Sequence, residues 1–315
     1  MESITVETPE RVIGGSGLQR FLTGIYIIWL RDFKRFWRDK IRRITAFIQP
    51  LVYLFLLGTG LQAAFTVFGA EAETKYVLFM YPGILGMTIL FTSVFSAMSI
   101  LWDREFGFLK EVLVSPVPRS SVAVGKIFGG ATTACLQGAI LMVIAFFPWF
   151  LGFSLTTLWK VLMLIPIMIL ISFGMTSVGV AIGARLKSFE AFPLLMNLLL
   201  LPLFFLSGAM FPLQGLPGWM TVLTRINPLS YSVDMLRGIA LKGVQVVSTG
   251  VSISPALRDY ITKAPPALRA EVAKLAPQVP KFQVQEYPMW LSLVVVIGFS
   301  LAMLVVAIWQ FSRTE

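Results

Sequence analysis

Residues 76–102, with the sequence YVLFMYPGILGMTILFTSVFSAMSILW, contain no Asp, Glu, Lys or Arg. A helix of roughly 20 mostly apolar residues crosses the hydrocarbon core of a bilayer, so this stretch is long enough to span a membrane. Composition agrees, because 57% of the 315 residues are hydrophobic, 13% are charged, and the mean hydropathy is +0.80. A soluble domain carries roughly 25% charged residues. The sequence therefore predicts an integral membrane protein.

Six runs of the chain lack Asp, Glu, Lys and Arg, and we interpret them as six membrane-spanning helices of an all-α protein. They are residues 44–70, 76–102, 127–159, 161–184, 191–224 and 287–312. The third and fifth runs are too long for one crossing, so each is expected to include a surface or re-entrant segment at one end. We divide the chain into an N-terminal segment, 1–43, and a six-span domain, 44–312.

The basic residues predict the orientation. With a cytoplasmic N-terminus, 16 of the 26 Lys and Arg residues lie on the cytoplasmic side, whereas the short loops of the other side contain only Lys75 and Lys160. Positive charges collect in cytoplasmic loops, and long loops count little in this comparison. We therefore expect both termini in the cytoplasm and the protein in the plasma membrane.

Several kinds of chemistry are excluded by composition. The chain has no His and a single Cys, Cys135, which excludes a Ser-His-Asp triad, a His-ligated metal and a disulfide within the chain. The Gly-rich residues 14–17 lack a following Lys, and Gly125-Lys126 is followed by Ile127, so neither is a phosphate-binding loop. The net charge of +10 is explained by membrane topology, and nucleic acid is not an expected partner.

Residues 18–44 have the pattern of an amphipathic helix that lies in the cytoplasmic membrane interface. Basic side chains at helical spacing share one face, namely Arg31, Arg35, Arg38 and Arg42. Apolar side chains follow the complementary spacing, namely Trp29, Phe33, Trp37, Ile41 and Ile44. The alternative is a solvated helix of a soluble domain.

The loop between the second and third spans, 103–122, begins with dense charge and ends at Pro116 and Pro118, which stop a helix. A short helix with Phe106 and Leu109 on one side could insert into a cleft of a partner protein. The alternative is a solvated loop that only anchors topology, and spacing alone slightly favours this alternative.

Two motifs resemble the ABC type-2 exporter permeases, a family that includes drug, lipid and polysaccharide exporters. One is the loop sequence DREFGFLKEVLVSPVPR at 103–119. The other combines LSGAMFPL at 206–213, Leu216-Pro217 and INPLSYSVDMLRG at 226–238, and resembles the drug-exporter and nodulation-factor branches. With the six-span layout, the likeness covers about residues 18–243 and 287–312.

The resemblance implies a role for each block. The helix at 103–111 would be the coupling helix that docks on a separate ATP-binding cassette subunit, and the N-terminal helix would be the connecting helix beside it. The coupling residues would be Arg104, Glu105, Phe106, Gly107, Lys110 and Glu111. ATP and Mg²⁺ would bind to the partner subunit, so this chain needs no cofactor and is not itself an enzyme. Because one chain supplies half of a pathway, a second copy is also implied.

The segment 207–243 is expected to form external re-entrant helices before the last span. Asn227 suits a helix N-cap and Pro228 suits a first turn. The resemblance makes this segment the external gate, in which Asp234 and Arg237, three residues apart, fix the geometry. The alternative is a surface salt pair of little energetic value. Residues 244–286 depart from the family pattern and predict a small external insertion.

The runs contain no ionisable side chain, which argues against coupling to protons or sodium ions. Their polar residues more often join helices than bind cargo; they include Gln49, Gln62, Gln137, Thr176, Ser177 and Asn197. Phe, Leu and Met in the spans suit an amphipathic or hydrophobic cargo. The leading hypothesis is thus the permease subunit of an ABC exporter, and the alternative is a nucleotide-independent transporter or channel.

Overall fold

The computed structural model describes residues 17–67, 76–107, 117–147, 151–186, 188–213, 216–243, 265 and 285–313. Every regular element within these ranges is helical, which confirms the all-α prediction. The helices along the first half of the chain are α1 (Gly17–Arg38), α2 (Lys40–Val52), α3 (Gly58–Val67), α4 (Tyr76–Ser96), α5 (Met98–Glu105) and α7 (Arg119–Met142). Those along the second half are α8 (Leu155–Arg185), α9 (Ala191–Phe205), α10 (Gly218–Ile226), α11 (Pro228–Ala240) and α14 (Met289–Ser312).

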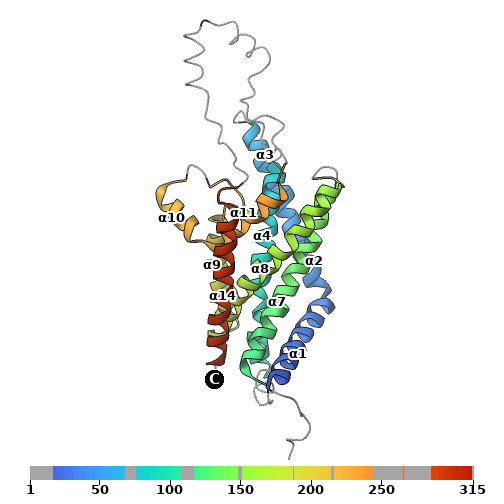
Figure 1. Cartoon of the computed structure of the whole chain (residues 1–315), viewed down its shortest axis with the longest axis vertical. Coiled ribbons are helices and arrows are strands. Elements are labelled where there is room, and N and C mark those ends of the chain that lie inside the picture. Colours follow the sequence, from blue (N-terminus) through green and yellow to red (C-terminus); the bar gives the residue numbers. More distant parts are fainter. Residues whose placement is uncertain are drawn as a thin grey trace, which may run out of the picture.

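The long helices form an upright bundle with α4 inside it (Figure 1). Helix α4 packs against α7 and α8, and α14 packs along α8. A helix that is apolar on all sides is a buried helix, and α4 buries large side chains around its whole circumference, among them Phe79, Ile84, Leu85 and Leu90. In contrast, α9 and α14 expose Leu, Val and Trp side chains, as expected for helices that face lipid.

Five helical stretches are long and apolar enough to cross a membrane. They are Arg43–Leu61, Tyr76–Glu105, Arg119–Phe146, Leu155–Arg185 and Met289–Ser312. The run 191–224 differs from the others, because its helix α9 has only 15 residues, or about 22 Å of rise. The chain turns after α9, where Gly208 has a φ of +73°, and α10 and α11 follow. Five of the six predicted spans therefore meet the length criterion, and the fifth run forms a shorter apolar helix.

The helix predicted over 18–44 is divided between α1 and α2, which meet at Asp39. Backbone hydrogen bonds continue across this point, from Asp39 N to Arg35 O at 3.3 Å and from Arg43 N to Asp39 O at 3.2 Å, so the chain stays on the helical path there. The position of α1 relative to a bilayer stays a prediction.

Helices α1 and α7 lie side by side and run in the same direction, because Gly24 lies against Ser121, Ile28 against Gly125, and Asp32 against Gly129. A Cβ atom on Gly125 would lie 2.8 Å from Ile28 Cβ, which is closer than real Cβ contacts. Glycines at this spacing let two helix backbones approach closely. The start of α1, the start of α7 and the end of α14 lie at one end of the bundle (Figure 1).

Candidate functional site

The carboxylate of Asp103, near the end of α5, lies where the predicted coupling loop begins and is 3% exposed. Arg31 on α1 donates to both of its oxygens, from Nη2 to Oδ1 at 2.6 Å and from Nη1 to Oδ2 at 3.0 Å. Two parallel charge-assisted hydrogen bonds fix orientation as well as distance. This contact therefore ties α1 to the last turn of α5.

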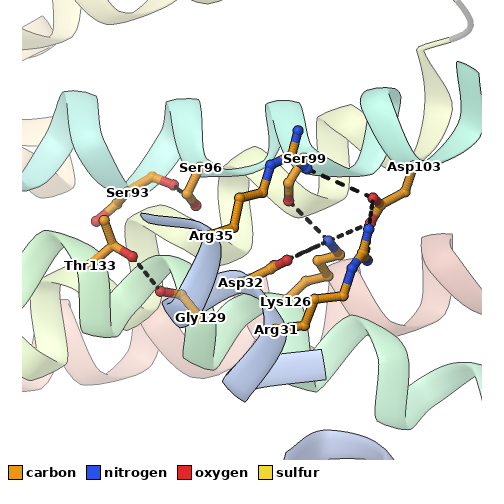
Figure 2. Close-up of polar contacts among 10 residues, drawn as sticks. All are labelled: Arg31, Asp32, Arg35, Ser93, Ser96, Ser99, Asp103, Lys126, Gly129 and Thr133. Carbon is orange, nitrogen blue, oxygen red and sulfur yellow. Dashed lines mark hydrogen bonds and ion pairs between the residues drawn. The ribbon is translucent and has the colours of Figure 1, made fainter. Parts of the chain in front are cut away.

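Lys126 on α7 completes the cluster and is also 3% exposed. Its Nζ donates to Asp103 Oδ2 at 2.6 Å and to Ser99 Oγ at 3.1 Å, and it lies 3.0 Å from Asp32 on α1 (Figure 2). An ammonium group has three donors, and each one finds a partner here. The cluster joins α1, α5 and α7 at a single point.

Buried charges are costly unless they are paired and hydrogen-bonded. Three cations, Arg31, Arg35 and Lys126, here surround two carboxylates, Asp32 and Asp103. Sequence reasoning missed this cluster, because Asp103 directly follows one uncharged run and Lys126 directly precedes another. The helices extend past those runs, so α5 and α7 include ionisable side chains that lie just outside the uncharged runs.

Trp102, next to Asp103, links α1 to the segment between α8 and α9. The guanidinium of Arg35 lies 4.3 Å from the Trp102 ring centroid. The Phe189 ring is stacked on Trp102 with a centroid separation of 6.0 Å. A cation over an indole ring is favourable, and more so when it is partly desolvated.

Arg104, one of the predicted coupling residues, points into its own chain. Its guanidinium donates to the Leu186 carbonyl and, at 3.0 Å, to the Ala184 carbonyl. These carbonyls belong to the end of α8, where the last carbonyls lack partners within the helix. Arg104 therefore caps α8 and connects it to α5.

The next residues face outward. Helix α5 ends at Glu105, which is exposed, and Phe106 is 80% exposed. Gly107 has a φ of +78°, a left-handed conformation that favours glycine and ends the helix. Lys110 and Glu111 lie outside the described residues. Of the predicted coupling residues that are described, Glu105 and Phe106 are available to a partner protein.

At the other end of the bundle, the segment around α11 has the local structure that the sequence predicts. The Asn227 side chain accepts a hydrogen bond from Leu229 N at 3.0 Å, and Pro228 occupies the first turn. Asn227 Nδ2 also donates to the Leu203 carbonyl in α9 at 2.7 Å, and Ser230 Oγ donates to the Leu206 carbonyl at 3.1 Å. These bonds attach the start of α11 to the end of α9.

Asp234 and Arg237 on α11 are buried, at 4% and 5% exposure, so they are not a surface salt pair. Each has its own hydrogen-bond partners. Asp234 accepts from the backbone N–H groups of Glu286 at 2.7 Å and Tyr287 at 3.1 Å. Arg237 Nη2 donates to the Gly208 carbonyl at 2.6 Å. No ion pair within 4 Å joins the two residues to each other in the described part of the chain.

Burial shifts the pKa values of Asp234 and Arg237, which lie outside the five long spans. Desolvation raises the pKa of Asp234, although the two backbone N–H groups and the positive charge of Arg237 act against it. Desolvation also lowers the pKa of Arg237 to about 10, and the charge of Asp234 opposes that shift. The Arg237 guanidinium is stabilised further by the Phe79 ring, whose centroid lies 3.9 Å away.

A groove of about 400 Å³ lies between α2, α4, α7 and α9. Gln49, Gln137 and Asn197, which are scattered in the sequence, all line it, together with Phe91. Gln137 also accepts a hydrogen bond from Thr92, so at least one of these polar groups joins helices. Of the described residues, no group of three His, Cys, Asp or Glu side chains could hold a metal ion.

Comparison with known proteins agrees with this architecture. The family model of the ABC-2 type transporter matches residues 23–241. The transport permease ycf38 of Cyanophora paradoxa is 30% identical over 219 residues, which cover 69% of this chain and 74% of the relative. Nodulation protein J of Rhizobium meliloti is 29% identical over 230 residues, covering 72% and 84%. The inner membrane transport permease YadH of Escherichia coli is 24% identical over 225 residues, covering 70% and 85%.

The match extends over most of the chain and over most of each relative. It includes both sequence motifs, the buried charge cluster and the segment around α11. The chain therefore belongs to the ABC-2 type transporter family, and it is the membrane subunit of an ABC transporter.

Proposed function

We propose that this permease works in an exporter driven by ATP, and that it moves an amphipathic or hydrophobic cargo such as a drug, a lipid or a glycan-linked molecule out of the cytoplasm or its membrane leaflet. A separate ATP-binding cassette subunit binds ATP and Mg²⁺ and docks on residues 103–111. Two copies of the permease pair and enclose the pathway. Both termini face the cytoplasm, in keeping with the start of α1 and the end of α14 at the same end of the bundle (Figure 1).

The observation that carries this proposal is that the start of the predicted coupling loop is bonded to three neighbouring helices. Asp103 is bound to α1 and α7 through Arg31 and Lys126, and Arg104 is bound to the end of α8. Glu105 and Phe106 then face outward. A push on the outward residues by a partner would therefore reach three helices besides α5 through short, charge-assisted bonds.

A displacement of α8 would also reach the opposite end of the bundle. Helix α8 packs along α14, and the residues that precede α14 donate backbone hydrogen bonds to Asp234 on α11. Helix α11 is also bonded to the end of α9. We propose that α11 moves with α9 and α14 as one unit and opens the external gate, with the groove at Gln49, Gln137 and Asn197 on the cargo pathway.

Co-expression of the permease with its ATP-binding subunit, followed by purification in mild detergent, tests the proposal. We expect a stoichiometric complex that hydrolyses ATP and, in proteoliposomes, exports cargo only when ATP is present. Glu105→Lys and Gly107→Trp change outward-facing or loop-shaping residues, so they should abolish transport and leave the permease folded. A control charge reversal at an exposed residue that follows the last turn of α14, Arg313→Glu, should leave transport unchanged.

Two results would contradict the proposal. A permease that purifies alone and still transports cargo without ATP would support the nucleotide-independent alternative. Normal ATP-driven export by both loop variants would remove residues 103–111 from the coupling role.

A further inference from the structure

A groove with a volume of about 1050 Å³ lies between the first turns of α8 and the end of α11. Two cationic side chains line it, Lys160 from α8 and Lys242 from the turn that follows α11. Apolar side chains line most of the remainder, among them Leu158, Leu162, Met163 and Ile239. A basic pocket beside an apolar helix surface is suited to the head group of an anionic lipid.

The described part of the chain does not compensate the positive charge of this groove. No Asp or Glu is among the described residues that line it. Lys160 is partly buried and Lys242 is exposed, and neither has a hydrogen-bond or ion-pair partner among the residues that the structure describes. The two ammonium groups are therefore available to a negatively charged ligand.

The groove lies at the level where α8 enters the apolar part of the bundle. The uncharged run 161–184 begins directly after Lys160, and the preceding residue, Trp159, is of the type that prefers the boundary between lipid and water. Helix α8 runs from this end of the bundle toward the opposite one, where Arg104 caps its last turn. The residues of α8 that follow Lys160 therefore lie deeper in the membrane than Lys160 itself.

An exposed apolar stripe leads from the groove in that deeper direction. Four side chains at helical spacing on one face of α8, each between 40% and 52% exposed, form the stripe, namely Leu158, Leu162, Ile165 and Ile169. Ile169 follows Lys160 by nine residues, or about 14 Å of helix rise, which is close to the thickness of the hydrocarbon part of one leaflet, about 15 Å. Lys160 is thus near the water-facing end of the apolar surface, as a lipid with an anionic head group requires.

We propose that this groove binds one anionic phospholipid, with its phosphate between Lys160 and Lys242 and an acyl chain along Leu162, Ile165 and Ile169. Charge complementarity selects the phosphate, and the apolar stripe selects a lipid over a free anion. The bound lipid would contact both α8 and the end of α11 and so hold these two segments together. The proposal concerns binding alone, so it depends neither on export nor on the ATP-binding subunit.

Native mass spectrometry of the purified full chain, titrated with short-chain phosphatidylglycerol or phosphatidylcholine, tests the proposal. We expect saturable binding of one phosphatidylglycerol per chain and no comparable binding of phosphatidylcholine. The double variant Lys160→Gln/Lys242→Gln should bind phosphatidylglycerol roughly 30-fold more weakly, from the typical contribution of two basic residues near an anionic surface. Leu162→Ala should weaken the binding of phosphatidylglycerol and leave its preference over phosphatidylcholine intact.

The matched control is Lys40→Gln/Arg225→Gln, which removes the same charge from two exposed residues that do not line the groove. It should bind phosphatidylglycerol within about twofold of the wild type. Phosphatidylglycerol should also raise the melting temperature of the wild type and of this control, and it should not raise that of Lys160→Gln/Lys242→Gln. Melting temperatures without added lipid verify that both double variants are folded.

Four outcomes would overturn the inference. Equal weakening in both double variants would mean that general electrostatic attraction holds the lipid. Equal binding of phosphatidylcholine would mean that only the apolar stripe is recognised, and displacement of phosphatidylglycerol by inorganic phosphate at equal affinity would make this a site for free anions. Binding that occurs only after Asp259→Asn/Glu271→Gln would assign the two lysines to acidic residues of this chain's own insertion, 244–286.

Discussion

Lys126 Nζ on α7 lies 2.6 Å from Asp103 Oδ2 on α5, and both side chains are almost completely buried. Asp103 is also the last buried residue before the chain leaves the bundle at Glu105 and Phe106. The pair therefore holds the base of the loop that is proposed to receive a partner. Separation of α5 from α7 would remove one direct partner from each of these two charges in a poorly solvated region.

Lys126→Met should lower the free energy of unfolding by about 3 kcal/mol, because it removes the buried cation that both Asp32 and Asp103 contact. Asp32 and Asp103 would then face each other with only arginines from α1 to balance them. Thermal or denaturant unfolding in detergent measures the loss. Lys40→Met, at an exposed position on α2, should change stability by less than about 0.5 kcal/mol.

The double variant Asp103→Asn/Lys126→Met tests whether the two residues act as a pair. The combined loss should be smaller than the sum of the single losses by about 1–3 kcal/mol, which is the usual range for contacting charged residues. Strictly additive losses would show that the two residues stabilise the bundle independently.

Arg104 and Glu105 are neighbours in sequence with opposite orientations, and their substitutions should separate stability from coupling. Arg104→Gln loses the charge-assisted bonds to the end of α8 and should cost about 2 kcal/mol of stability. Glu105→Gln should be neutral for stability and reduce the stimulation of partner ATPase activity. Unfolding curves and ATPase assays on the same preparations distinguish the two effects, and a stability loss at Glu105 equal to that at Arg104 would contradict this assignment.

Phe106→Ala should weaken association with the ATP-binding subunit by tenfold or more, because exposed aromatic side chains often anchor protein interfaces. The same variant should unfold within about 0.5 kcal/mol of the wild type, since the side chain is 80% exposed. Detergent pull-down at varied permease concentration measures the association. Unchanged association would place the docking contacts beyond Phe106.

Asp234 should make stability depend on pH. Its folded-state pKa is raised above the ordinary value, so the folded protein holds this proton more tightly than the unfolded chain does. The stabilising contribution is complete below the ordinary carboxyl pKa of about 4, and it is lost as pH rises through the raised value. Melting temperatures of wild type and Asp234→Asn between about pH 4 and 8 should show the wild type losing stability relative to the variant. A constant difference over this range would contradict the shift.

Much of the local structure was predictable from the sequence. Asn227 followed by Pro228 predicts a capped helix start, and the structure shows that cap with α11 beginning at Pro228. The uncharged runs predict where the long helices lie, but the helices extend beyond the runs. A helix can include a charged residue such as Lys126 when a residue on a neighbouring helix compensates its charge. Helical spacing also predicts a pair at Asp234 and Arg237, although each residue has partners on other segments.

Composition and periodicity, taken alone, determined that the chain is an all-α membrane protein, and the ordered motifs at 103–119 and 206–238 determined its family. These properties follow from local chemistry. The length of an apolar run determines whether it can span the membrane, and the helical period determines which residues share a face. Only the tertiary structure decided that Asp103 pairs with Arg31, 72 residues away, and that Arg104 caps α8. The physical reason is that ion pairs between helices depend on how far each helix is shifted and rotated against its neighbour, and close contacts such as Gly125 against Ile28 set that register.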